Sequence, residues 1–268
     1  MLIGLMFASL FDSFSTAKVE FDEILKFYPD TILDTFNITN SYLSTVENFV
    51  SGQFYTLYLL IGSVFAFYMG VGEIGGKIDD KTIGQWLTKT MSRSNLFTNQ
   101  FLTNFIALSI TNISINLLLY IQLIIFTNQE SISQKYFFAI TISTLIFFFS
   151  WASIGQLVGI FMEKSKAQGL GAGIIIISWF INTLSSIGGF PDWLNKLSIF
   201  TLFDIVNIRD NFEINWLHIL TLICISLLSL LIGIYYFQKK ISTYSIIKYA
   251  NSVYIRTNTK RRYKIYPP

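Results

Sequence analysis

The chain has 268 residues, of which 52% are hydrophobic, 17% aromatic and 13% charged, and its formal net charge is +3. Soluble domains carry roughly 25% charged residues, so about half of the usual solubilising charge is absent. This composition excludes an ordinary soluble enzyme, a disordered chain and a basic nucleic-acid-binding domain.

The first eleven residues form an apolar stretch that is short for a membrane span. At 1.5 Å per residue, a helix of this length covers roughly 16 Å of a hydrocarbon core of roughly 30 Å. We expect a short or truncated first helix. The alternative is a cleaved signal peptide, but that reading requires a basic leader, and no Lys or Arg precedes residue 18.

Five further stretches contain no charged residue and approach or exceed the length of about 20 residues that a spanning helix needs. They cover residues 54–72, 96–126, 136–162, 170–187 and 216–237. None shows the alternation of a barrel strand, and a backbone in hydrocarbon must satisfy its own hydrogen bonds, so helices are expected. The predicted fold is an all-α integral membrane protein, a six-helix bundle over residues 1–240, followed by a basic tail over 241–268.

The segments between these stretches differ in charge on the two sides of the membrane. Segments 73–95, 163–169 and 238–268 hold fourteen basic and four acidic residues. The segments on the other side hold five basic and twelve acidic residues. The positive-inside rule then predicts a multi-pass protein of the plasma membrane with both termini in the cytoplasm. Anionic lipid explains the basic tail without a nucleic acid partner.

Several motifs suggest chemistry that their context does not support. Residues 70–75 match a dinucleotide fingerprint, which is meaningful only between a strand and a helix, and the following Gly76-Lys77 lacks the other residues of a phosphate loop. A lone Cys224 and a lone His218 provide neither a disulfide nor a metal cluster. We therefore expect no catalytic, cofactor-binding or metal-binding residue on this chain, which is not predicted to be an enzyme. An intramembrane protease is disfavoured because no stretch holds paired acids or a Ser/His arrangement.

The stretch 96–126 is unusually polar for a helix that faces lipid. Its residues Asn104, Asn112 and Asn116 fall within about 120° of one another on a helix of 3.6 residues per turn. One interpretation is hydrogen bonding between helices. The other is a polar stripe along a substrate path or a dimer seam.

Small residues recur at four-residue spacing on both sides of the turn near residue 165. The first pair is Gly155 and Gly159, and the second pair is Gly169 and Gly173. Such spacing lets helix backbones approach closely, so we expect a tight hairpin of these two helices. Between the last two spans, the periodicity of residues 192–209 predicts an amphipathic or re-entrant helix at the outer interface.

The segment 73–93 predicts a short amphipathic helix in the cytoplasm. Asp79 and Asp80 suit its start, and Arg93 suits its end. Its apolar face holds Ile83, Trp86, Leu87 and Met91. This face either packs against the bundle or the membrane surface, or it enters a groove on a partner protein.

In this loop the sequence resembles the type 2 permease family of ATP-binding-cassette transporters. The family pattern of an acidic residue, a Thr, a hydrophobic pair and Ser-Arg corresponds here to Glu73, Thr82, Trp86-Leu87 and Ser92-Arg93. The chain departs from the pattern at Lys81 and Thr90, where the family has Gly and Pro. The resemblance extends over residues 20–241.

The resemblance implies that residues 79–93 form a coupling helix that docks on a separate ATPase subunit, where ATP and magnesium are bound. The docking residues that it implies are Glu73, Asp80, Thr82, Ile83, Trp86, Leu87, Met91, Ser92 and Arg93. Two such ATPase subunits and two permease subunits, identical or different, would export a peptide, an antibiotic, a drug or a lipid through the membrane. The alternative is a non-transport immunity or sensor protein that binds a partner through the same helix.

Overall fold

The computed structural model describes residues 46–80, 92–126, 133–186 and 198–263, together with Phe27 and Thr82. Within these ranges every regular element is a helix, in agreement with the all-α prediction. Five helices are long and apolar enough to cross a membrane. The spans are Glu47–Val71, Ser94–Ile125, Gln134–Phe161, Lys164–Leu184 and Trp216–Lys240. The sixth span expected over residues 1–11 lies outside the described residues.

The first described helical run continues from Val46 to Asp79 without interruption. It consists of α4 (Val46–Val50), the π-helical turn η1 (Ser51–Tyr55), α5 (Thr56–Val71), a second π-helical turn η2 (Gly72–Gly76) and α6 (Lys77–Asp79). The run begins before residue 54, and Glu47 lies in its first turn. Glu47 is only 7% exposed, and its Oε1 accepts a hydrogen bond from the backbone N–H of Ser133.

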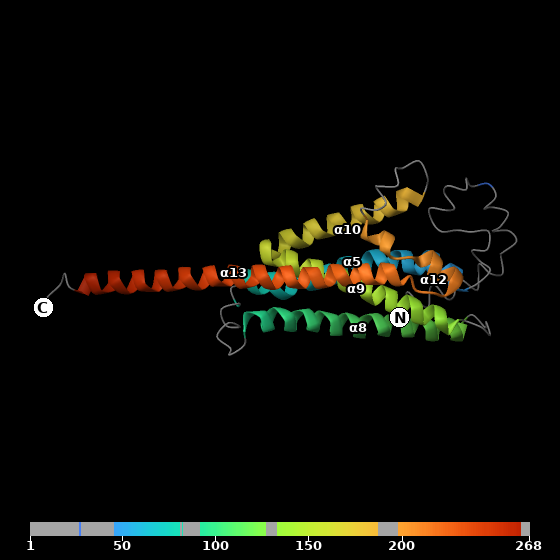
Figure 1. Cartoon of the computed structure of the whole chain (residues 1–268), viewed down its shortest axis with the longest axis horizontal. Helices are drawn as coiled ribbons and strands as arrows, with labels where there is room; N and C mark the ends of the chain where they lie inside the picture. The colour runs from blue at the N-terminus through green and yellow to red at the C-terminus, as the bar shows by residue number, and fades with distance from the viewer. Residues whose placement is uncertain are drawn as a thin grey trace.

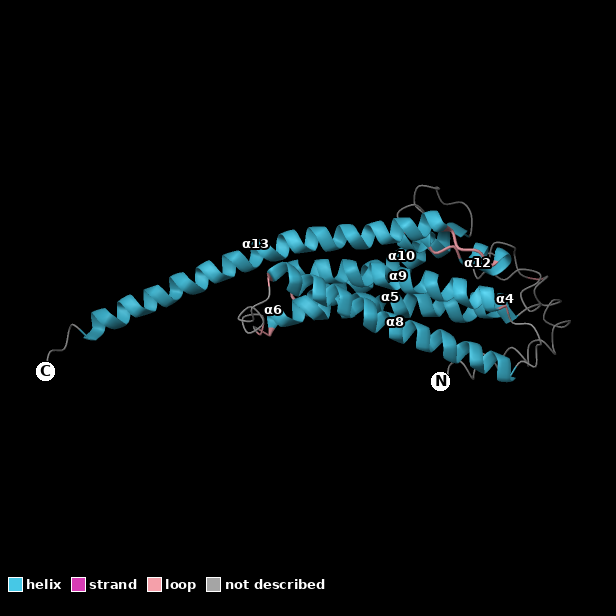
Figure 2. Ribbon diagram, turned by 60° about the horizontal axis from the view of Figure 1, so that its bottom comes forward, coloured by secondary structure: helices cyan, strands magenta, loops and turns pink. Residues whose placement is uncertain are grey.

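Three long helices follow: α8 (Arg93–Phe126), α9 (Gln134–Phe161) and α10 (Lys164–Ser186). The last helix, α13 (Trp216–Tyr263), does not end with its apolar stretch. It projects beyond the bundle, as Figures 1 and 2 show. No glycine or proline interrupts residues 234–266, so nothing in the backbone stops the helix where the basic residues begin.

Helix α9 is the most buried of the five spans and packs against α5, α8 and α13. Its contact with α5 requires glycine on both sides. A Cβ atom added at Gly155 would lie 2.3 Å from the backbone oxygen of Phe67, and one added at Gly70 would lie 2.0 Å from that of Ala152. The two backbones therefore approach more closely than any side chain would allow.

The glycine prediction is wrong about the partner helix. Gly155 and Gly159 pack α9 against α5 and η2, whereas a Cβ atom at Gly169 or Gly173 would have nothing within 4 Å. Helix α10 diverges from α9 after the short turn that joins them (Figure 1). A small residue permits close approach but does not specify which backbone approaches it, and here it is the backbone of α5.

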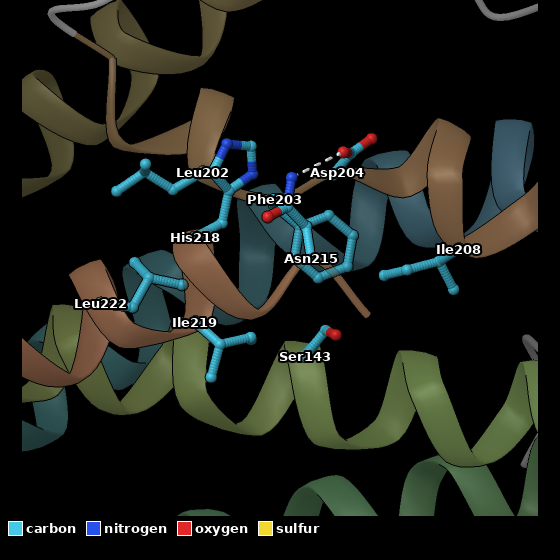
Figure 3. A pocket seen from close by; sticks show the side chains of 9 residues that line it. All are labelled: Ser143, Leu202, Phe203, Asp204, Ile208, Asn215, His218, Ile219 and Leu222. Atoms are coloured by element: carbon cyan, nitrogen blue, oxygen red, sulfur yellow. Dashed lines mark hydrogen bonds between the residues drawn. The ribbon is translucent and has the colours of Figure 1, made fainter. Parts of the chain in front are cut away.

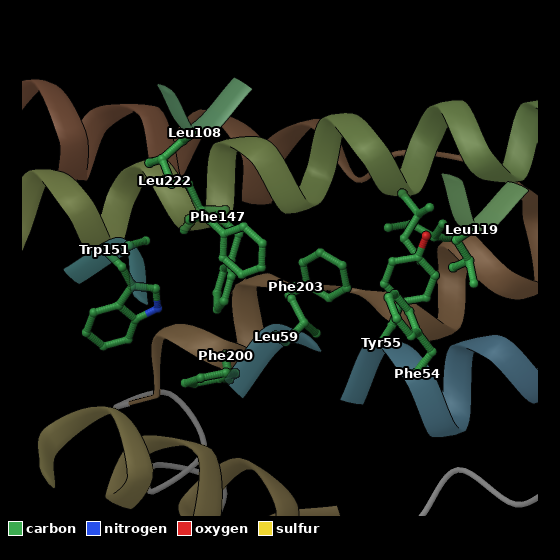
Figure 4. Packing of buried hydrophobic residues seen from close by; sticks show 14 of the residues in the cluster. Phe54, Tyr55, Leu59, Leu108, Leu119, Phe147, Trp151, Phe200, Phe203 and Leu222 are labelled. Carbon is green, nitrogen blue, oxygen red and sulfur yellow. The ribbon is translucent and has the colours of Figure 1, made fainter. Parts of the chain in front are cut away.

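The segment before α13 is also folded differently from the prediction. In its described part, the single amphipathic helix over residues 192–209 is replaced by the 3₁₀ turn η3 (Ile199–Leu202) and the short helix α12 (Ile205–Asn211). Phe200, within η3, and Phe203, directly after it, enter the core, where their rings lie 5.1 and 5.6 Å from the ring of Phe147 (Figure 4). The aromatic residues of this segment thus pack between helices.

Candidate functional site

Three asparagines of α8, at positions 104, 112 and 116, are buried and form hydrogen bonds with other helices. Asn112 Oδ1 accepts hydrogen bonds from Tyr58 Oη of α5 at 2.8 Å and from Thr144 Oγ1 of α9 at 3.0 Å. Asn112 Nδ2 donates to the backbone oxygen of Thr141 at 2.9 Å. The amide of Asn112 therefore joins α5, α8 and α9.

Asn116 extends this cluster by one turn. Its Oδ1 accepts a hydrogen bond of 2.5 Å from Tyr55 Oη, and its Nδ2 donates to Asn112 Oδ1 at 3.2 Å. We name these residues the amide cluster: Tyr55, Tyr58, Asn112, Asn116 and Thr144. Apart from the Asn116–Asn112 bond within α8, these hydrogen bonds connect helices of one chain, as in the first interpretation of the polar stripe. The substrate path and the dimer seam stay predictions.

Asn104 lies apart from the amide cluster. Its Nδ2 donates to Gln156 Oε1 of α9 at 3.3 Å, and Gln156 Nε2 donates to the backbone oxygen of Phe97 at 3.0 Å. Asn104 Oδ1 and Gln100 Oε1 are buried without a partner. Gln156 was not among the predicted site residues, although a glutamine next to Gly155 in an apolar stretch is a signal for such a contact.

The end of the bundle that contains α4 and α12 carries buried charge that the sequence analysis missed. Arg209 is 8% exposed, and its Nε lies 2.7 Å from Asp210 Oδ1. Ser51 Oγ and Tyr136 Oη share a hydrogen bond of 2.6 Å near the buried Glu47. In the sequence, this buried charge is signalled by Glu47, which comes shortly before an apolar stretch.

A small cavity lies beside α12 at the same end (Figure 3). Its volume is about 10 Å³, close to that of one water-sized probe. Ser143 Oγ and His218 Nδ1 line it without a hydrogen-bond partner, and Asn215 Nδ2 donates to Asp204 Oδ2 at 3.4 Å beside them. The space suits a bridging water better than any larger ligand.

The opposite end of the bundle, named the α6 end, contains the described part of the predicted coupling segment. Asp79 Oδ2 accepts a hydrogen bond of 2.5 Å from the backbone N–H of Lys164, the first residue of α10. Asp79 was expected to cap its own helix, but it occupies the start of another helix, where a carboxylate is favourable. Asp80 is exposed, and its backbone N–H donates to the oxygen of Gly76.

The described residues on both sides of the predicted coupling segment form local hydrogen bonds. Thr82 Oγ1 donates to the backbone oxygen of Lys77 at 3.4 Å, and Ser92 Oγ accepts from the N–H of Asn95 at 3.2 Å, as an N-cap of α8 does. Glu73 lies in η2, and Arg93 is the first residue of α8. The predicted apolar face lies outside the described residues: Ile83, Trp86, Leu87 and Met91.

The turn from α9 to α10 lies at the same end. Lys166 Nζ is 2.8 Å from Glu163 Oε2, and this hydrogen bond, together with the positive charge, holds the pKa of Glu163 below its ordinary value. Across the ranges described above, no three His, Cys, Asp or Glu side chains gather as a metal site would require.

Comparisons of the chain with protein-family models, with curated proteins and with solved structures found no match.

Proposed function

We propose that the chain is the permease subunit of an ATP-driven exporter of the type 2 ATP-binding-cassette family. In this proposal a separate subunit binds ATP and magnesium and hydrolyses the ATP. The observation that carries the proposal is the hydrogen bond between Asp79 and the backbone of Lys164. It ties the segment that resembles a coupling helix to the first turn of α10, on the side where basic residues predominate.

The helices on both sides of the segment 80–92 pack against the bundle, so a movement of this segment would be transmitted to the bundle. On one flank, η2 packs on α9 at Gly159, where a Cβ atom at Gly75 would lie 3.2 Å from the Gly159 oxygen. On the other flank, the ring of Phe97 lies 5.4 Å from that of Phe237. A force applied between residues 80 and 92 would therefore reach α5, α8, α9, α10 and α13, and could bias the bundle between two conformations.

The proposed cargo is amphipathic or apolar, because the interior polar groups of the amide cluster are neutral amides and hydroxyls. Among the described residues, the buried charged side chains are Glu47, at the start of the first described span, and Arg209, in α12 outside the spans. A charged substrate would find no opposite charge midway through the bundle. The working assembly is proposed to contain two permease and two ATPase subunits in the plasma membrane, with both termini of this chain in the cytoplasm.

The experiment is purification of the tagged chain from its native membranes in a mild detergent, followed by mass spectrometry of the bound proteins. We expect a stoichiometric ATPase subunit that is lost in Trp86→Asp. The matched control is Gln85→Asp, which places the same charge on the opposite side of the predicted helix and should keep the subunit.

Two results would contradict the proposal. One is the absence of an ATPase under conditions that preserve a known membrane complex. The other is equal retention of the ATPase in Trp86→Asp and Gln85→Asp when both variants show wild-type helix content. Either result would favour the immunity or sensor function, in which a different protein binds the helix.

A further inference from the structure

A groove with a volume of about 300 Å³ lies between α5 and α8, and α9 contributes to its lining. This volume is at the lower end of the range of about 300–1,000 Å³ that is typical of small-molecule sites. The groove is open at the surface of the bundle, because two of its lining residues, Ile61 and Phe65, are 66% and 50% exposed.

The groove lies near the middle of both spans that form it. Its α5 residues fall within 58–65 of the span Glu47–Val71, and its α8 residues fall within 108–115 of the span Ser94–Ile125. The medium that surrounds a spanning helix at this depth is lipid hydrocarbon. The opening of the groove therefore faces acyl chains.

Aromatic contacts hold one wall of the groove in place. A Cβ atom at Gly62 would lie 2.3 Å from Cζ of Phe148, so the ring of Phe148 occupies the room that this glycine leaves. The ring of Tyr58 lies 5.1 Å from the ring of Phe148 in an edge-to-face arrangement. The concave shape is thus built into the packing of α5 against α9.

The lining has few polar groups, and each donates within the protein. Tyr58 Oη donates to Asn112 Oδ1, Thr111 Oγ1 donates to the backbone oxygen of Ala107, and Asn112 Nδ2 donates to that of Thr141. No charged side chain lines the groove. A headgroup or a charged ligand would lose its solvation here without compensation, whereas an alkyl chain would not.

The size of the groove also favours an acyl chain over a neighbouring helix as its occupant. A helix with its side chains is about 10 Å wide, so a neighbouring helix would cover the groove without filling it. The groove has room for a stretch of an alkyl chain.

We propose that this groove is a binding site for one acyl chain of a membrane phospholipid. Because both the groove and the bilayer are apolar, the preference comes from dispersion contacts in a preformed concave surface and from the avoidance of a void. The expected enrichment over bulk lipid is therefore several-fold. The proposal does not depend on the exporter function.

The test uses the full chain in phosphatidylcholine vesicles that contain a small fraction of phosphatidylcholine with a diazirine in the middle of one acyl chain. After irradiation, labelled peptides are quantified by mass spectrometry. We expect residues 58–65 and 108–115 to carry several times the label of lipid-facing positions on α13 such as Leu220 and Leu231, which are 60% and 63% exposed. Labelling in proportion to exposure alone would overturn the proposal.

A variant that fills the groove provides the control. Ile115→Trp should lower the label on residues 58–65 to the level of α13, whereas Ile113→Trp should leave it unchanged, because Ile113 lies on α8 outside the groove and is 49% exposed. If Ile115→Trp does not fold, Thr111→Trp at the exposed rim replaces it. Persistent labelling in a folded groove-filling variant would overturn the proposal. If the purification experiment finds no ATPase, the labelling of the groove is unaffected. The exporter function and the acyl-chain site can therefore fail independently.

Discussion

Tyr55, the last residue of η1, and Asn116 form one of two similar contacts between the helical run that includes η1 and α5 and the helix α8. Tyr55 Oη donates to Asn116 Oδ1, and one turn further along both helices Tyr58 Oη donates to Asn112 Oδ1. The residue numbers rise along α5 while they fall along α8, which is the register of antiparallel helices. Two Tyr–Asn hydrogen bonds one turn apart define both the rotation and the translation of α8 relative to α5.

Asn112→Ala should lower the free energy of unfolding by about 1–2 kcal/mol, because the Tyr58 hydroxyl loses its acceptor in a part-buried site. The Thr144 hydroxyl keeps the backbone oxygen of Ile140 as an acceptor at 2.8 Å. The measurement is reversible unfolding in mixed detergent micelles, followed by circular dichroism. The matched control is Ser114→Ala, an exposed polar residue on the same helix. Equal effects of the two substitutions would show that the amide cluster does not contribute to stability.

Gly155→Ala and Gly169→Ala should change stability in opposite directions. At Gly155 the new methyl group would lie 2.3 Å from the backbone oxygen of Phe67, so α5 and α9 must separate and the protein is destabilised. At Gly169 nothing lies within 4 Å, and the higher helix propensity of alanine should stabilise α10 by up to about 1 kcal/mol. The same unfolding assay compares the two variants, and destabilisation by Gly169→Ala would indicate a contact made in an assembly.

Asp79→Ala should accelerate amide exchange at the start of α10, because the N–H of Lys164 loses its acceptor. Hydrogen–deuterium exchange of a peptide that begins near residue 163 measures this effect. Asp80→Ala removes a neighbouring carboxylate whose side chain is exposed, so it should leave the exchange unchanged. If both variants behave like the wild type, the Asp79 contact does not persist in solution.

Lys166→Met should raise the pKa of Glu163 towards its ordinary value, since the hydrogen bond and charge of Lys166 lower it. A depressed pKa in the folded state contributes stability above the ordinary pKa of a glutamate, and this contribution is lost as the pH falls through the lowered value. The side chains are 68% and 66% exposed, so the effect on stability should be small. Carbon NMR titration of the Glu163 carboxyl group measures the pKa, and an unchanged value in Lys166→Met would show that the ion pair does not form.

Several features of the molecule could be predicted from the residues alone. The five described spans contain the uncharged stretches except for a few terminal residues, such as Gly72 and Phe126, and the inward face of α8 agrees with the helical positions of Asn104, Asn112 and Asn116. Both follow from local properties, because the cost of placing a residue in hydrocarbon is a sum over single side chains, and three residues on one helix share a face by geometry alone.

Other features depend on helices that are far apart in the sequence. The predicted span begins at residue 54, whereas the helix begins at Val46 and Glu47 is buried against the start of α9. Asp79 was predicted to cap its own helix, but its carboxylate instead accepts a hydrogen bond from the first backbone N–H of α10. In each case the local pattern identifies a group that needs a partner, and the partner lies more than eighty residues away.

The sequence by itself determined that the chain is helical, that it is apolar enough to span a membrane five times, and which faces of its helices carry amides and glycines. Only the tertiary structure decided that Gly155 meets α5, that Asn112 joins three helices, and that a groove remains between α5 and α8. The physical reason is that hydropathy and periodicity are properties of one segment. Close packing and hydrogen bonding are properties of pairs of segments, and their relative placement is set by the fold.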